Sequence, residues 1–110
     1  MDIKDLPRNP LEVTIRMVGC KWKILVVAEL LEGTKRFNEI KKSLKGITQK
    51  VLTSKLRELE QDGLLTKEVS KNKSEYTLTN IGYSLRPVIY SLKDWGKDYK
   101  KYLKLLSKYN

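Results

Sequence analysis

The fold is decided by residues 46–64, GITQKVLTSKLRELEQDGL. Within this stretch Leu52, Leu56 and Leu59 recur at spacings of four and three residues, which predicts one buried face of an α-helix. Thr48 is placed to cap the start of this helix, and Gly63 follows its end. The face opposite the leucines is polar and basic and comprises Gln49, Lys50, Thr53, Ser54 and Arg57.

The residues on either side of this stretch predict a further short helix before it and a β-hairpin after it. Residues 36–44 carry Phe37, Ile40 and Leu44 at helical spacing, and Lys45 and Gly46 interrupt the pattern. Two helices joined by a short turn form a helix-turn-helix, in which the second helix enters the major groove of DNA. After Gly63 the pattern changes to two short strands, 64–70 and 74–78, which predict a β-hairpin whose tip is Lys71-Asn72-Lys73.

Helices are also predicted at both ends of the chain. Asn9 and Pro10 open a helix that stops near Gly19, and residues 21–32 are apolar nearly all round, which places them at the centre of the core. From Thr79 a long helical pattern runs to Leu106, with Pro87 expected to kink or bend its early part. We therefore expect a mainly α (α+β) fold: a winged helix-turn-helix with a two-stranded hairpin as the wing and a long C-terminal helix.

Length and charge limit the partners. The chain has 110 residues and a formal net charge of +10. We expect a single domain over 1–110, with the helix-turn-helix at about 36–63 and the wing at about 64–78. The excess positive charge lies entirely in residues 34–78 and 79–110, which have nets of +5 each. This favours a polyanionic partner.

The residue inventory argues against an enzyme. Cys20 is the only cysteine and the chain has no histidine, so we expect no metal site, no cofactor and no histidine-dependent nucleophile. The carboxylates of Glu58, Glu60 and Asp62 are interpreted as a solvated helix surface. No apolar run is long enough to span a membrane and no leader segment is evident, so a cytoplasmic location without membrane contact is expected.

The chain resembles the HxlR family of winged-helix regulators, which are MarR-like. The resemblance covers residues 9–96 and rests on four separated motifs: GCKWK at 19–23, LLEGTKRFNEI at 30–40, GITQKVLT with LRELEQDGL at 46–64, and YTLT at 76–79 followed by Gly82 and Leu85. It implies a homodimeric transcription regulator whose first and C-terminal helices, about 10–19 and 80–107, form the dimer interface.

The apolar side chains near the end of the C-terminal helix support the same interface, because they are more than a domain of this size needs for its own core. The alternative is that the C-terminal helix folds back onto its own core. The residues assigned to the interface are Leu11, Ile15, Leu92, Trp95, Tyr99, Tyr102, Leu103 and Leu106.

Redox-responsive members carry a sensing Cys-Pro pair before the first helix, and here Asn9-Pro10 stand in its place. Cys20, beside Lys21 and Lys23, is the remaining candidate redox sensor, and an inert or buried thiol is the preferred alternative.

Double-stranded DNA is the expected partner, bound at an inverted repeat. Base readout is assigned to Gln49, Lys50, Thr53 and Ser54, because Gln, Lys and Thr can pair with adenine, guanine and the thymine methyl group. Backbone contacts are assigned to Lys35, Arg36, Lys41, Lys42, Thr48 and Arg57, and wing contacts to Lys71, Asn72 and Lys73. A protein-interaction module without DNA binding is the alternative function, and the sequence identifies no small-molecule effector.

Overall fold

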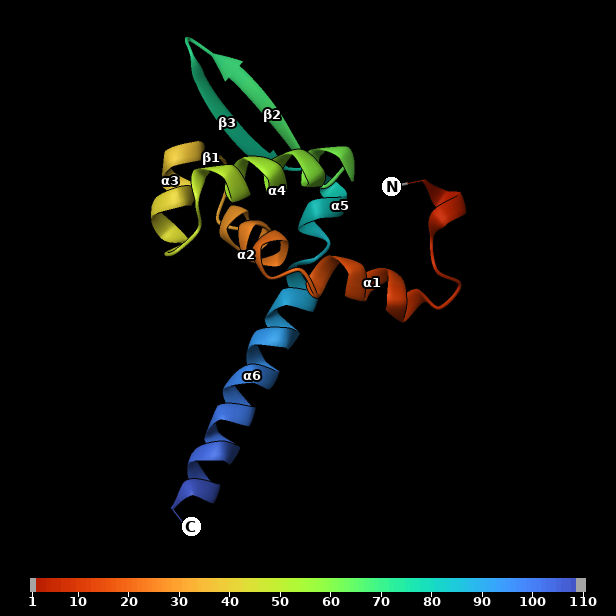
Figure 1. The fold of residues 1–110 in the computed structure, drawn as a ribbon, viewed down its shortest axis with the longest axis vertical. Helices are drawn as coiled ribbons and strands as arrows, with labels where there is room; N and C mark the ends of the chain where they lie inside the picture. Colours follow the sequence, from red (N-terminus) through yellow and green to blue (C-terminus); the bar gives the residue numbers. More distant parts are fainter. Residues whose placement is uncertain (1, 109–110) are drawn as a thin grey trace.

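The computed structural model describes residues 2–108 and shows a helical body from which two elements project (Figure 1). A 3-10 helix at Ile3–Asp5 precedes α1 (Pro10–Val18) and α2 (Lys21–Leu30). The body continues with β1 (Lys35–Arg36), α3 (Phe37–Ser43) and α4 (Gln49–Gln61). The hairpin of β2 (Leu65–Ser70) and β3 (Lys73–Leu78) follows, then α5 (Asn80–Tyr83) and α6 (Arg86–Ser107). The winged helix-turn-helix predicted from the sequence is confirmed.

Local signals place the helix ends as predicted. The Asn9 side chain accepts a hydrogen bond from the Leu11 N–H at 2.9 Å and opens α1, and Gly19 follows its last residue. The Thr48 hydroxyl accepts one from the Val51 N–H at 3.1 Å and opens α4. These caps satisfy donors that the first turn of a helix cannot satisfy internally.

The sheet has one strand more than the predicted hairpin. Its order is β1-β3-β2, all antiparallel, with Lys35 opposite Tyr76 and Arg36 opposite Glu75. Sequence periodicity does not reveal β1, because a strand of two residues has no alternation to detect. It ties the start of α3 to the base of the wing.

The wing itself closes in a tight turn. Ser70 pairs with Lys73, so Lys71 and Asn72 form a two-residue loop, with φ of 49° and 65°. Positive φ at both loop residues is the geometry of a type I′ turn, whose twist matches that of the flanking strands. The turn fixes the register that places Tyr76 and Leu78 of β3 in the core.

The predicted C-terminal helix is divided. Thr79 caps the four-residue α5, Ser84 and Leu85 form a turn, and Pro87 lies in the first turn of α6. The division follows from Pro87, which has no N–H to continue the hydrogen-bond ladder but suits the start of a new helix. The expected bend is therefore a break, and α6 leaves the body in its own direction (Figure 1).

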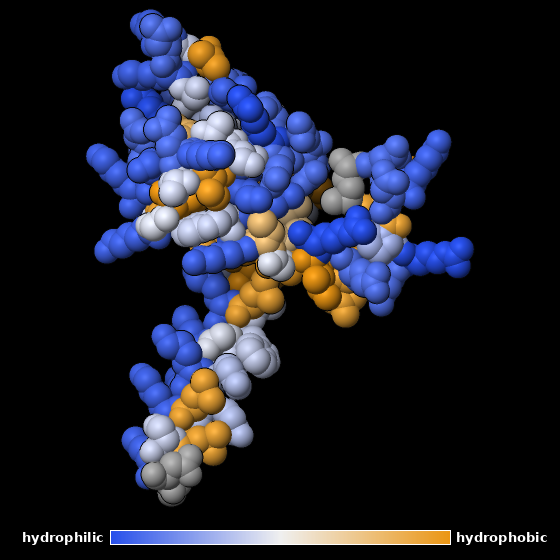
Figure 2. Space-filling model, in the orientation of Figure 1, coloured by the Kyte–Doolittle hydropathy of each residue, from blue (hydrophilic) through white to orange (hydrophobic). Residues whose placement is uncertain are grey.

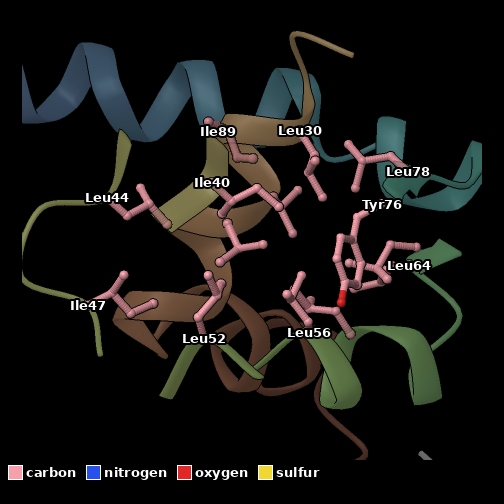
Figure 3. Close-up of a cluster of buried hydrophobic side chains, with 14 residues drawn as sticks. Leu30, Ile40, Leu44, Ile47, Leu52, Leu56, Leu64, Tyr76, Leu78 and Ile89 are labelled. Atoms are coloured by element: carbon pink, nitrogen blue, oxygen red, sulfur yellow. The ribbon is translucent and has the colours of Figure 1, made fainter. Parts of the chain in front are cut away.

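The core lies between α2, α3, α4 and the hairpin. Figure 3 shows Leu30, Ile40, Leu52 and Tyr76 converging from these four elements. Val26, Val27 and Leu30 of α2 are completely buried, as the all-round apolar pattern predicted. Among residues 2–108 every buried side chain is apolar except that of Tyr76, which carries a hydroxyl group.

Gly82 allows α5 to close against the end of α4. A Cβ built on Gly82 would lie 2.2 Å from the Leu64 carbonyl oxygen, which is fixed because it accepts a hydrogen bond from the Thr79 N–H at 3.0 Å. The Thr79 hydroxyl also donates to the Gly63 carbonyl at 2.7 Å. The side chain at position 82 is therefore limited to hydrogen.

We predict that Gly82→Ala lowers the free energy of unfolding by about 1–3 kcal/mol, because backbone must move to admit the methyl group. Urea denaturation followed by circular dichroism measures the effect. The matched control is Ile81→Ala, since Ile81 is 60% exposed and should change stability by less than about 0.5 kcal/mol. Equal stability of Gly82→Ala and the wild type would contradict the close packing of α5.

Candidate nucleic-acid interface

The outward face of α4 forms a shallow depression lined by polar and charged residues. Leu52, Leu56 and Leu59 bury the inner face, which leaves the opposite side chains to solvent. The depression is lined by Gln49, Lys50, Thr53, Ser54, Arg57, Glu58 and Gln61. The structure thus brings together the four residues predicted to read bases and Arg57. It adds Gln61, which sequence reasoning missed although it lies one helical turn beyond Arg57.

A second depression lies between the start of α3 and the wing. It is lined by residues of both elements: Arg36, Phe37, Asn38, Glu39, Asn72, Lys73 and Ser74. Arg36 is half-exposed, and its Nε lies 3.7 Å from a carboxylate oxygen of Glu75 on β3. Strand β1 therefore holds Arg36 beside the wing and not beside α4.

Two predicted lysines lie together further along α3. Lys41 and Lys42 are exposed and line a third depression with Asn38. Asn38 was not predicted, and only its position one turn before Lys41 and Lys42 could have indicated it. An amide beside two ammonium groups provides donors for anionic oxygens.

The structure argues against a DNA contact by Lys35. Its ammonium binds Glu29 and, at 3.3 Å, Glu32, and its side chain is only 17% exposed. The hydrogen bond to Glu29 raises the pKa of Lys35 against the opposing effect of burial, and Glu32 adds to the rise. A charge already neutralised by two carboxylates is a poor phosphate ligand, so these ion pairs weigh against the DNA contact assigned to Lys35, which stays a prediction. Strand β1 directs this side chain towards α2, which the sequence did not indicate.

Two of the three carboxylates near the end of α4, Glu58 and Asp62, are also paired, so the predicted solvated surface describes only the exposed Glu60. Lys23 of α2 contacts Asp62 at 2.8 Å, with both side chains largely buried, and Lys55 contacts Glu58 at 3.2 Å. The hydrogen bond to Glu58 raises the pKa of Lys55 against burial, and the nearby Cys20 thiol adds to that rise. The Lys23–Asp62 pair connects the end of α4 to α2, whereas the Lys55–Glu58 pair lies within α4.

Cys20 occupies the N-cap position of α2 and is half-buried, with no side-chain capping bond. Of the two lysines expected to influence it, Lys23 is directed to Asp62, and Lys21 lies over the Trp22 ring with its Nζ 4.5 Å from the centroid. A redox role for Cys20 stays a prediction.

The residues assigned to a dimer interface are exposed. Exposed fractions reach 63% for Leu11 on α1 and 66% for Trp95 on α6. The Trp95 and Tyr99 rings stack with centroids 5.0 Å apart, and Tyr99 and Tyr102 follow at 6.2 Å. The alternative in which this stripe folds back onto its own core is wrong for the described chain, because α6 projects away from the body (Figure 1).

Residues 2–108 contain neither a membrane-spanning helix nor a cluster of metal ligands. No helix in this part of the chain is long and apolar enough to cross a membrane. Nor do its cysteine and carboxylate side chains form a group of three or more that could hold a metal ion.

Comparison with known sequences identifies a family. The profile of the HxlR-like helix-turn-helix family matches residues 17–104. The HTH-type transcriptional regulator YdeP of Bacillus subtilis is 49% identical over 99 residues, which cover 87% of this chain and 77% of that protein. An HTH-type transcriptional regulator of Methanothermobacter thermautotrophicus is 44% identical over 91 residues, which cover 80% and 70% of the two chains.

Solved structures show the same fold. The redox regulator HypR in its reduced form is 39% identical and superimposes with a TM-score of 0.80, covering 87% of this chain and 98% of that one. A MarR-family regulator from Enterococcus faecalis V583 is 37% identical with a TM-score of 0.74, covering 91% and 94%.

The Glu29–Lys35 pair predicts a stability that depends on pH. Burial acts to raise the pKa of Glu29, but the hydrogen bonds from Lys35 and Ser43 and the Lys35 charge outweigh it, so the pKa is lowered. A carboxyl group whose pKa is lower in the folded state than in the unfolded state stabilises the fold at pH values above the unfolded-state pKa. This stabilisation is lost as the pH falls through the folded-state pKa. Glu29→Gln should cost about 1–3 kcal/mol at neutral pH, because it removes a charged partner from a largely buried lysine.

Chemical denaturation at several pH values measures this effect. The difference between the wild type and Glu29→Gln should shrink below about pH 4.3, the ordinary glutamate value. Glu32→Gln is the matched control, since Glu32 contacts the same lysine with a side chain that is 68% exposed, and it should cost less than about 1 kcal/mol. A pH-independent difference for Glu29→Gln would exclude the ion pair as its cause.

Proposed function

Since this chain belongs to the HxlR-like helix-turn-helix family of DNA-binding transcriptional regulators, we propose that it binds an inverted-repeat operator as a homodimer. The observation that carries the proposal is the outward face of α4, where Gln49, Lys50, Thr53 and Ser54 line one open depression with Arg57. Each subunit would contribute one such helix as its recognition helix. On this proposal residues 1–110 form one domain, with helix-turn-helix and wing at about 36–63 and 64–78.

Base readout is assigned to the N-terminal half of α4. Gln49, Lys50 and Ser54 are exposed there and Thr53 is half-buried. An amide can form two hydrogen bonds with adenine, an ammonium can donate to guanine, and a threonine methyl can contact the thymine methyl. Polar side chains that vary along the groove give selectivity, whereas a purely basic face would give affinity alone.

Phosphate contacts are assigned to the residues around that half-helix. Lys41 and Lys42 are exposed on α3, Arg57 lies on the outward face of α4, and Thr48 caps the start of that helix. Arg36 stands beside the wing. The exposed wing residues Lys71, Asn72 and Lys73 extend the same positive surface to a neighbouring groove. Glu75, paired with Arg36, limits the net charge there.

The proposed dimer joins α1 and α6 of two chains, about 10–19 and 80–107. On α6, Leu92, Gly96, Tyr99 and Leu103 recur at spacings of four and three, as in the seam of two helices packed lengthwise. A Cβ at Gly96 would meet nothing within 4 Å in its own chain, and a glycine inside a helix costs about 1 kcal/mol relative to alanine. A partner helix that approaches at this point would account for a glycine there.

The operator prediction is tested by selecting bound genomic fragments with the purified protein and footprinting the product. Two recognition helices related by a twofold axis should protect an inverted repeat with half-site centres about 10 base pairs apart or a multiple of that. Gln49→Ala should reduce the preference for one base, at one position of each half-site, by about 1–3 kcal/mol of binding free energy, because one bidentate base contact is lost.

The control is Glu60→Ala, which truncates an exposed α4 side chain that does not line the depression. It should leave base preference unchanged. An asymmetric footprint would count against the dimeric reader, and a uniform loss of affinity in Gln49→Ala across all sequences would remove Gln49 from base readout.

The dimer is tested by one substitution at two positions. Leu103 is 45% and Leu105 56% exposed, and helical geometry places them on nearly opposite sides of α6. Leu103→Asp should convert the dimer to a monomer in light scattering, since it places a charge in an apolar seam, while Leu105→Asp should remain dimeric. If both variants stay dimeric, the stripe on α6 does not hold the subunits together.

A further inference from the structure

One face of α6 is a continuous row of lysines. Lys93, Lys97, Lys100, Lys101, Lys104 and Lys108 are all exposed, and at 100° per residue they fall within a sector of about 100° of the helix. Asp94 and Asp98 lie outside that sector. Figure 2 shows hydrophilic residues along one edge of the projecting helix, and apolar residues and residues of intermediate hydropathy over the rest of its visible face.

The charge on this lysine face has no ion-pair partner in the part of the chain that the structure describes. Among residues 2–108 no ion pair joins these lysines to a carboxylate. The Lys93 ammonium lies 5.9 Å from the centre of the Tyr90 ring. The row from Lys93 to Lys108 extends about 22 Å along the helix axis.

The lysine face is distant from the proposed reading surface. The molecule measures 58 Å along its longest axis, and the wing and the C-terminal end of α6 lie at opposite ends of it (Figure 1). A straight duplex bound to α4 and the wing of one chain therefore lies against the half of that chain that does not contain the lysine face. The apolar stripe of α6 faces the opposite way, so pairing with a second copy through that stripe would leave the lysines outward.

The composition of the face indicates its partner. Stable protein interfaces need buried aromatic or apolar anchors and are depleted in lysine, and between Lys93 and Lys108 this face has no such anchor. Regularly spaced ammonium groups on a helix match the phosphates of a duplex, which require charge and no shape-specific pocket.

We propose that the lysine face of α6 is a second DNA-binding surface, independent of sequence, that holds the phosphate backbone of a duplex segment other than the one in the recognition helices. This rests on the proposed function, because the recognition helices must be occupied by an operator. A dimer would present two such faces, and it could therefore bring a second duplex segment next to a bound operator.

The test uses the intact protein on the selected operator duplex, fixed to beads and saturated with protein. A labelled, random-sequence 30-base-pair duplex is then added. The wild type should retain the second duplex, and the combined variant Lys97→Gln, Lys100→Gln, Lys101→Gln and Lys104→Gln should retain about tenfold less, because four phosphate contacts per chain are lost. Glutamine keeps helix propensity close to that of lysine.

Two controls separate the outcomes. The corresponding four-arginine variant should retain the second duplex, and the glutamine variant should keep its operator affinity within about threefold. Equal capture of the second duplex by wild type and glutamine variant overturns this inference and leaves the proposed function intact. A monomeric glutamine variant also overturns it, since the lysines would then hold the partner subunit. Absence of operator binding by the wild type would instead refute the proposed function.

Discussion

The enclosure of α2 is the constraint on which the rest of the structure depends. Val26, Val27 and Leu30 have no exposed surface, and burying such side chains contributes about 1.5–3 kcal/mol each. The middle of α2 is apolar on most sides, so neighbouring elements must cover most of it. It contacts α1, α3, α4, β3 and α6. The elements that carry the candidate DNA face are thereby oriented by one central helix.

Sequence patterns predicted the parts of the fold that are set by local chemistry. The capping by Thr48 and the leucine spacing of α4 depend on neighbours within one helix, and both were found as predicted. Strand β1 and the orientation of Lys35 depend on residues more than forty positions away, such as Tyr76, and no local pattern contains that information. The break before α6 was only half predicted, because Pro87 indicates an interruption without deciding between a kink and a turn.

The same distinction applies to the candidate interface. Helical spacing was sufficient to group Gln49, Lys50, Thr53 and Ser54, because one helix presents them all. It could not group Arg36 with Asn72 and Lys73, which come together only through the sheet. Nor could it separate the lysines that face solvent from Lys35 and Lys23, whose charges stabilise contacts between elements. Counting basic residues therefore overstates the charge available to a polyanion.

The two-residue turn at Lys71 and Asn72 limits how the wing can diversify. It fixes the pairing in which Tyr76 and Leu78 face inward, and a slip of one residue would exchange the inward and outward faces of a strand. Side chains at the tip can be replaced without disturbing the core, whereas a single residue inserted in either strand would turn buried side chains such as Tyr76 and Leu78 towards solvent. In related proteins with this fold, the wing should therefore acquire new DNA preferences by substitution more readily than by small changes in length.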